Sequence, residues 1–248
     1  NVWCAAGKGT FGTDEIVDRI ESVQLEKVVN HRKLIVPQLG APGVAAHLVR
    51  KRCGFSVIYG PIRALDIIAF IKAGNKATPQ MRQVRFTFYD RLVLTPLELM
   101  MTRRYVIFAA AALFLLSGLS RQGYSTHLAA ENAIRILLTV LAAGIAGAVV
   151  GPLRLPWLPG RSFSFKGLIA GLLVVAAVSL LKLTQGGLET VAWVLIIPAA
   201  ASFLTMNFTG ASTYTSLSGV RKEMRIAMPL QLIGASLGLI LWIAARFV

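Results

Sequence analysis

The feature that most constrains the fold of this chain is a series of five apolar runs in its second half. Each run approaches the roughly 20 residues that an α-helix needs to cross the hydrocarbon core of a bilayer. Hydrophobic residues make up 55% of the chain, which exceeds their share in an ordinary soluble protein. We therefore expect a membrane α-helical domain over residues 105–248. Its predicted spans are 105–120, 132–151, 167–183, 190–206 and 226–245.

Basic residues gather on alternate sides of these spans. The larger set lies before the first span and in the loops that follow the second and fourth spans. It comprises Arg103, Arg104, Arg154, Arg161, Lys166, Arg221, Lys222 and Arg225. The opposite loops hold little beyond Arg121 and Lys182. Because loops rich in Lys and Arg stay in the cytoplasm, we expect a multi-pass protein of the cytoplasmic (inner) membrane. Its N-terminal part is predicted to lie in the cytoplasm and its C-terminus outside.

The net charge of +15 can also indicate nucleic-acid binding. The basic residues are scattered along the chain, however, and no nucleic-acid recognition motif accompanies them. We therefore expect membrane lipid, and no nucleic acid, as the partner of these side chains.

Three spans contain two glycines four residues apart, namely Gly147 with Gly151, Gly167 with Gly171, and Gly234 with Gly238. Such pairs let helix backbones approach closely, either within one chain or between two chains. Glu131 and Arg135 are one helical turn apart, and we interpret them as a structural ion pair. The bundle as a whole is predicted to be an anchor.

The first 90 residues alternate helical patterns with short apolar strands. Helices are predicted from Asp14 (with Thr13 as the cap), over 44–51 and over 62–73, and strands over 34–36 and 55–59. This alternation favours an α/β domain with a parallel sheet and helices on its faces. Ligands of such sheets bind at the carboxyl ends of the strands. In this chain the loops at those ends are residues 37–43 and Gly60-Pro61.

Near the end of this domain, Val84, Phe86 and Phe88 alternate with other residues in a pattern that predicts a further strand. An amphipathic linker that approaches the membrane is expected to follow, with Arg91 placed for lipid headgroups. The predicted organisation is an α/β domain over 1–90, a linker over 91–104 and the membrane domain over 105–248.

The most distinctive stretch is residues 1–13, which place Cys4 among the small residues Ala5, Ala6, Gly7 and Gly9. A flat and bulky group could lie directly against such a backbone. If Cys4 opens a helical turn, free N–H groups and Lys8 favour its thiolate form. A thiolate is a nucleophile or a soft metal ligand. The alternative is a buried structural cysteine, which is our interpretation of Cys53.

Two nucleotide-binding motifs can be excluded for this stretch. Residues 7–12 satisfy G-x-G-x-x-G, but that fingerprint requires an acidic residue at the end of the next strand. Here the next strand ends in Pro37-Gln38. A Walker A motif requires Ser or Thr after its lysine, whereas Gly9 follows Lys8.

Residues 1–8, with the sequence NVWCAAGK, resemble the signature of HgcA, a family of corrinoid proteins that methylate mercury in anaerobic microbes. The layout is also similar, since that family joins a small α/β domain to a membrane bundle. The resemblance implies a Rossmann-like corrinoid-binding domain that is N-terminally truncated here, because the family carries further sequence before this motif. It also implies a cobalamin or related corrinoid cofactor and a methyltransferase activity.

The resemblance assigns Cys4 as the catalytic residue and as the lower axial ligand of cobalt. None of the three histidines, His31, His47 and His127, follows the D-x-H-x-x-G pattern that supplies an imidazole ligand in other corrinoid modules. The expected cofactor-binding residues are Asn1, Trp3, Cys4, Ala5, Ala6, Gly7, Lys8, Thr10, Gln38, Leu39, Gly40, Ala41, Gly60 and Pro61.

The family cycle implies further partners. Cobalt takes a methyl group from a one-carbon donor, which is a methyl donor protein or a methyl-folate, and methylcobalt(III) passes it to Hg(II). A ferredoxin-like protein of the HgcB type, with iron–sulfur clusters, restores the reduced cobalt. Cys4 and Cys53 are too few to hold such a cluster, so this chain needs an external electron donor.

Two alternatives belong to other functional classes. The chain can be a corrinoid methyl carrier of one-carbon metabolism, which would bind corrinoid without acting on mercury. It can also be a non-catalytic membrane subunit or transporter whose α/β domain is a docking module, which would bind no chromophore.

Overall fold

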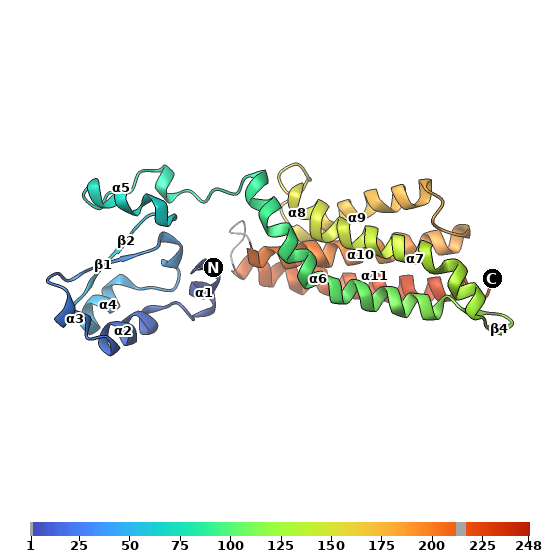
Figure 1. Cartoon of the computed structure of the whole chain (residues 1–248), viewed down its shortest axis with the longest axis horizontal. Helices are drawn as coiled ribbons and strands as arrows, with labels where there is room; N and C mark the ends of the chain where they lie inside the picture. Colours follow the sequence, from blue (N-terminus) through green and yellow to red (C-terminus); the bar gives the residue numbers. More distant parts are fainter. Residues whose placement is uncertain (1, 212–216) are drawn as a thin grey trace. The chain divides into compact units, whose positions relative to one another are not determined.

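The computed structural model describes residues 2–211 and 217–248 (Figure 1). Asn1 and the side chains of Trp3 and Cys4 lie outside the described part. The chain divides into two compact units, Asn1–Arg85 and Phe86–Val248, and each is presented by itself. Most of the described residues are helical.

The N-terminal unit contains a pair of parallel strands, β1 (Lys33–Val36) and β2 (Ser56–Tyr59), joined through helix α4 (Ala46–Cys53). Lys33 pairs with Ser56, and Val36 pairs with Tyr59. The other elements are α1 (Val2–Lys8), α2 (Thr13–Ser22), α3 (Leu25–Val28), η1 (Gln38–Gly40), η2 (Ala64–Asp66), α5 (Ile67–Lys72) and η3 (Gln80–Arg82). The predicted strands and the connecting helix are thus confirmed. In the described part this sheet has two strands, and a Rossmann-like domain stays a prediction.

The core of this unit forms where α2 and α4 pack against the sheet. Ile16 and Ile20 lie one turn apart on α2 and are buried with Val36, Val49 and Phe55. Each fully buried side chain of this kind stabilises a fold by about 1.5–3 kcal/mol. Thr13 is the first residue of α2 rather than its cap, and its hydroxyl accepts a hydrogen bond from the backbone N–H of Ala45 at 2.9 Å. This bond joins the start of α2 to the start of α4.

The predicted strand over 84–88 is wrong. Residues 84–87 belong to no strand, and Phe88 begins the helix α6 (Phe88–Leu116). The reason is a capping box, in which Thr87 accepts from the N–H of Asp90 and the Asp90 carboxylate accepts from the N–H of Thr87 at 2.8 Å. These reciprocal bonds start a helix and outweigh the alternation of apolar residues. Residues 91–104, expected as a separate linker, therefore lie inside α6.

The second unit is a helical bundle with one short hairpin. Its elements are α6, β3 (Leu119–Ser120), β4 (Gly123–Tyr124), α7 (Thr126–Ile145), the π-helical turn η4 (Ala146–Val150), α8 (Gly151–Leu153), α9 (Phe163–Leu180), α10 (Gly186–Asn207), η5 (Phe208–Ala211) and α11 (Leu217–Ala244). Within the described residues, five helical segments are long and apolar enough to cross a membrane. This is consistent with a multi-pass membrane protein.

Helix α10 is the common partner of all three glycine pairs. A Cβ atom at Gly171 would lie 2.5 Å from the Cα of Pro198, and one at Gly147 would lie 2.9 Å from the Cα of Ala201. The hydroxyl of Thr205 donates to the carbonyl of Gly147 at 3.0 Å. The other glycines that face α10 are Gly151, Gly167, Gly234 and Gly238. The pairs therefore join helices within one chain.

This packing predicts the effect of enlarging a glycine. Gly171→Leu would force its new side chain against the backbone of α10, and overpacking of this kind costs about 1–3 kcal/mol or more. Gly234→Leu is the matched control, because a Cβ atom at Gly234 would meet no described atom closer than 3.8 Å. We expect a lower free energy of unfolding for Gly171→Leu alone, measured by denaturation of the purified protein in detergent micelles. Equal values for the two variants would contradict this account of the packing.

Arg91 does not extend toward headgroups as expected. It is 2% exposed, and its guanidinium donates to the carbonyl of Phe86 at 2.8 Å. The same group lies 5.8 Å from the ring centroid of Phe86 and 5.7 Å from that of Trp157. Arg91 thus fastens the start of α6 to the loop between α8 and α9.

At the opposite end of the bundle, a buried ion pair joins the start of α10 to the C-terminal residues. A guanidinium nitrogen of Arg246 lies 2.8 Å from Glu189 Oε2, and each side chain is 8% exposed. Glu189 also accepts from the indole N–H of Trp193 at 3.2 Å. The guanidinium of Arg246 lies 4.5 Å from the ring centroid of Trp242.

The expected pair between Glu131 and Arg135 is replaced by other contacts. Glu131 lies 3.5 Å from the ring nitrogen of His127, and Arg135 donates to the side-chain oxygen of Asn132 at 2.8 Å. A residue on a helix can contact neighbours three or four positions away on either side. Here Glu131 and Arg135 each contact the neighbour on the N-terminal side, so they do not pair with each other.

Candidate functional site

The Cys4 segment forms a short helix that ends at a glycine. Cys4 lies in α1, with Lys8 one turn further along the same helix. After α1, Gly9 adopts the left-handed conformation with φ of +82°, which favours glycine and ends helices. The N–H of Gly9 and that of Thr10 then donate to the carbonyls of Ala6 and Ala5, at 3.3 and 2.9 Å.

Helix α1 packs against η1, in the loop that follows β1. Ala6 is buried, and a Cβ atom at Gly43 would lie 2.9 Å from the carbonyl oxygen of Ala6. The carbonyl of Gly43 also accepts from the N–H of Thr13 at 3.1 Å. The structure therefore brings the Cys4 segment and the loop 37–43 together at the carboxyl end of β1.

Within this loop, the expected ligand-binding residues differ in their exposure. Gln38, Leu39 and Ala41 are half-buried, whereas Gly40 is buried. A Cβ atom at Gly40 would lie 2.6 Å from the ring of Phe11. Phe11 was not among the predicted site residues, although it is an aromatic residue within a glycine-rich segment. It occupies the space that the missing side chain of Gly40 leaves.

Gly60 and Pro61 lie at the same edge of the sheet. The N–H of Gly60 donates to the carbonyl of Val36 at 2.8 Å, which ties the ends of the two strands together. The hydroxyl of Tyr59 donates to the carbonyl of Val44 at 2.6 Å. Because Gly60 and Pro61 are both buried, they position the strand ends and offer little surface to a ligand.

The outer side of the Cys4 segment is open. Gly7, Lys8 and Thr10 are exposed, and Ala5 is half-buried. A Cβ atom at Gly9 would meet no heavy atom within 4 Å. The hydroxyl of Thr10 donates to the carbonyl of Ala5 at 3.3 Å. As far as the described side chains extend, there is thus free space beside Gly9.

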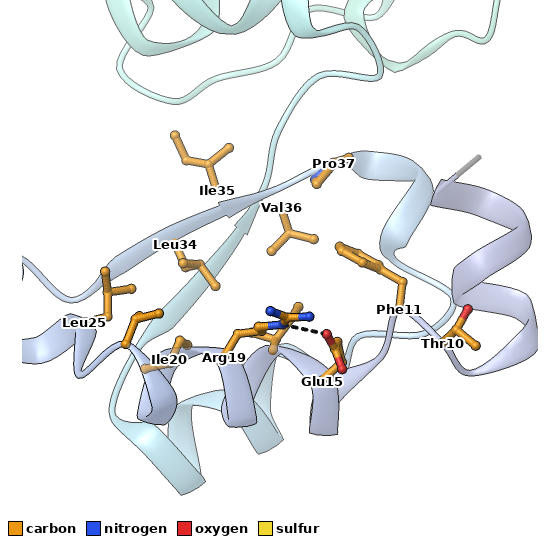
Figure 2. Close-up of a pocket in the computed structure, with 12 residues that line it drawn as sticks. Thr10, Phe11, Glu15, Arg19, Ile20, Leu25, Leu34, Ile35, Val36 and Pro37 are labelled. Atoms are coloured by element: carbon orange, nitrogen blue, oxygen red, sulfur yellow. Dashed lines mark hydrogen bonds and ion pairs between the residues drawn. The ribbon is translucent and has the colours of Figure 1, made fainter.

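An apolar groove of about 530 Å³ adjoins the segment at Thr10 and Phe11. Figure 2 shows it between α2 and β1. Its apolar lining consists of Phe11, Ile16, Ile20, Val23, Leu25, Leu34, Ile35, Val36 and Pro37. Arg19 donates to Glu15 at 2.8 Å at this groove, and the hydrogen bond raises the pKa of Arg19 above its ordinary value. The two charges compensate each other, so the groove is suited to an apolar group.

The other potential metal ligands are scattered. Among the described residues, which exclude the side chain of Cys4, no three His, Cys, Asp or Glu side chains form a group that can hold a metal ion. His31, His47 and His127 are all exposed. The thiol of Cys53 donates to the carbonyl of Val49 at 3.1 Å within α4, as expected for a structural cysteine.

Comparisons of the chain with protein-family models, with curated proteins and with solved structures found no match. The family resemblance therefore rests on the residues of the signature and on the order of the two units.

Proposed function

We propose that this chain is a membrane-anchored corrinoid protein that transfers a methyl group to Hg(II) and forms methylmercury. The observation that carries the proposal is the position of the NVWCAAGK signature. Its helix α1 packs on the loop at the carboxyl end of a parallel strand, which is where α/β sheets bind their ligands.

The residues present are compatible with a corrinoid. A corrin ring is broad and flat, Gly7 is exposed, and a Cβ atom at Gly9 would meet no described heavy atom within 4 Å. Thr10 and Lys8 are exposed and can bind polar groups at the periphery of such a ligand. Phe11 and the apolar groove extend this surface along β1. The thiolate of Cys4 can serve as a soft donor to the cobalt ion.

In this proposal Cys4 is the catalytic residue, and its thiolate would hold the cobalt ion of the corrinoid. The bound corrinoid would supply the cobalt ion that carries the methyl group. A thiolate donates electron density to a metal more strongly than an imidazole does. Hg(II) is a soft electrophile, which accepts a methyl group together with its bonding electrons. The thiolate of Cys4 therefore suits mercury as the acceptor.

The remaining parts of the proposal concern the cellular setting. The distribution of basic residues favours the inner membrane, with the α/β unit in the cytoplasm and the C-terminus outside. The electron donor is a ferredoxin-like protein of the HgcB type, and the methyl group comes from a donor protein or a methyl-folate. The helical bundle anchors the chain.

An anaerobic UV–visible spectrum tests the cofactor and its ligand. Full-length protein is reconstituted with cobalamin, and wild type is compared with Cys4→His and with Cys53→Ala. We expect a spectrum of thiolate-ligated cobalt in wild type and in Cys53→Ala, and an altered spectrum in Cys4→His. A wild-type protein that does not bind cobalamin would refute the proposal.

A further inference from the structure

Two adjoining cavities lie beside α9 and α11, at the end of the bundle that carries Arg161 and Lys222, and α10 lines the second of them. The first, which we term the basic cavity, has a volume of about 440 Å³. The second, the apolar cavity, has about 370 Å³ and extends along the three helices. Ser164, Ile226 and Ala227 line both, so the two cavities are neighbours that share one wall.

The basic cavity carries uncompensated positive charge. Arg161 and Lys222 are exposed at its wall, and in the described part of the chain neither is paired with a carboxylate. The third charged residue of the wall, Glu223, accepts from the N–H of Ser164 at 2.6 Å through its Oε1. That bond places the carboxylate at the N-terminus of α9, where negative charge is favourable. The two cations outweigh this one carboxylate, so the wall keeps a net positive charge that favours an anionic ligand.

The apolar cavity is open to the surroundings of the bundle. Leu168 and Leu230 line it and are 38% and 65% exposed, so hydrocarbon chains can reach it. Gln231 lies on its wall with 9% of its surface exposed. The amide nitrogen donates to the hydroxyl of Ser202 at 2.8 Å, and the amide oxygen has no partner among the described residues.

We propose that these cavities bind one anionic phospholipid, with its phosphate at Arg161 and Lys222 and one acyl chain in the apolar cavity. The order of the surfaces, cationic at the end of the bundle and apolar further in, matches the polarity of such a lipid along its length. Basic pockets between membrane helices are suited to anionic headgroups. A free phosphate would leave the apolar cavity empty, and a neutral lipid would leave both cations without a partner.

Native mass spectrometry of the full-length protein in neutral detergent tests this proposal. The probes are phosphatidylglycerol and phosphatidylcholine with identical acyl chains, added in equal amounts. Wild type should retain phosphatidylglycerol preferentially, and loss of each cation should lower its retention about fivefold. The test variant is Arg161→Gln with Lys222→Gln. The control is Arg221→Gln with Arg225→Gln, which removes the same charge from exposed residues of α11 that do not line the cavity.

A third variant, Gly234→Leu, tests the acyl chain. Gly234 lines the apolar cavity, and its Cβ would meet no atom closer than 3.8 Å, so the leucine would fill the cavity and reduce retention of both lipids. Equal retention of the two lipids by wild type, or equal retention by the two charge variants, would overturn the proposal. Displacement of the lipid by inorganic phosphate would also overturn it, because it would indicate a site for a free anion. If a variant does not fold, the retention of phosphatidylglycerol relative to phosphatidylcholine by wild type alone tests the proposal.

Discussion

Cys4→Ala is expected to abolish the methylation of Hg(II). Residues that only support a metal ligand typically contribute 10–100-fold, so loss of the ligand itself should lower the rate by about 100-fold or more. The assay measures methylmercury formed by membranes that contain the full-length protein, the ferredoxin-like partner and a methyl donor under anaerobic conditions. Cys53→Ala is the matched control, because the thiol of Cys53 contacts its own helix, and its rate should equal that of wild type.

The possible outcomes separate the functional classes. Methylation at the wild-type rate by Cys4→Ala would refute the role of this thiolate. Wild-type protein that binds cobalamin but forms no methylmercury would favour a methyl carrier of one-carbon metabolism. Protein without any bound chromophore would favour a non-catalytic membrane subunit. The folding of Cys4→Ala is checked by its elution as a single species in detergent.

Glu189→Ala is expected to destabilise the bundle by about 3 kcal/mol or more, because it leaves the buried guanidinium of Arg246 without its carboxylate. The change also removes the acceptor for the indole N–H of Trp193. We expect this loss in the free energy of unfolding, measured in detergent micelles. Glu131→Ala should change it by only about 0.5 kcal/mol or less, because the side chain of Glu131 is 55% exposed and its contact with His127 lies at the surface.

A conservative variant separates charge from hydrogen bonding at the same position. Glu189→Gln keeps an acceptor for Trp193 but loses the charge opposite Arg246, so its stability should lie between those of wild type and Glu189→Ala. If Glu189→Ala and Glu131→Ala proved equally stable, the buried ion pair would contribute little to the fold.

Local sequence patterns were sufficient to predict the strands β1 and β2 and the five long helices. In β1 the apolar run Leu34-Ile35-Val36 is short and followed by a proline, whereas each predicted span is an apolar run that approaches the length needed to cross a membrane. The capping box of Thr87 and Asp90 was also visible in the sequence. The alternation of Val84, Phe86 and Phe88 competes with this signal, because it favours a strand over the same residues.

Contacts between distant residues were beyond such reasoning. Nothing local to Glu189 indicates that it pairs with Arg246, and nothing local to Gly40 indicates that the ring of Phe11 lies against it. The glycine pairs predicted close helix packing, but only the arrangement of the bundle shows that α10 is their shared partner. At the candidate site, the sequence indicated the chemistry of Cys4, and the structure adds the packing of its helix on the loop 37–43.

The central position of α10 also has a consequence for the order of events during synthesis. The glycine faces of α7–α8 and α9 leave the ribosome before residues 186–207 have been made, so they enter the membrane without their partner. A nascent chain that stops before α10 exposes these small-residue faces, which other membrane helices can bind. When α10 arrives it covers the glycine faces of α7–α8 and α9, whereas α11 packs on an α10 that is already in place. Arrival of α10 is thus the step at which η4, α8 and α9 gain the partner that their glycines face.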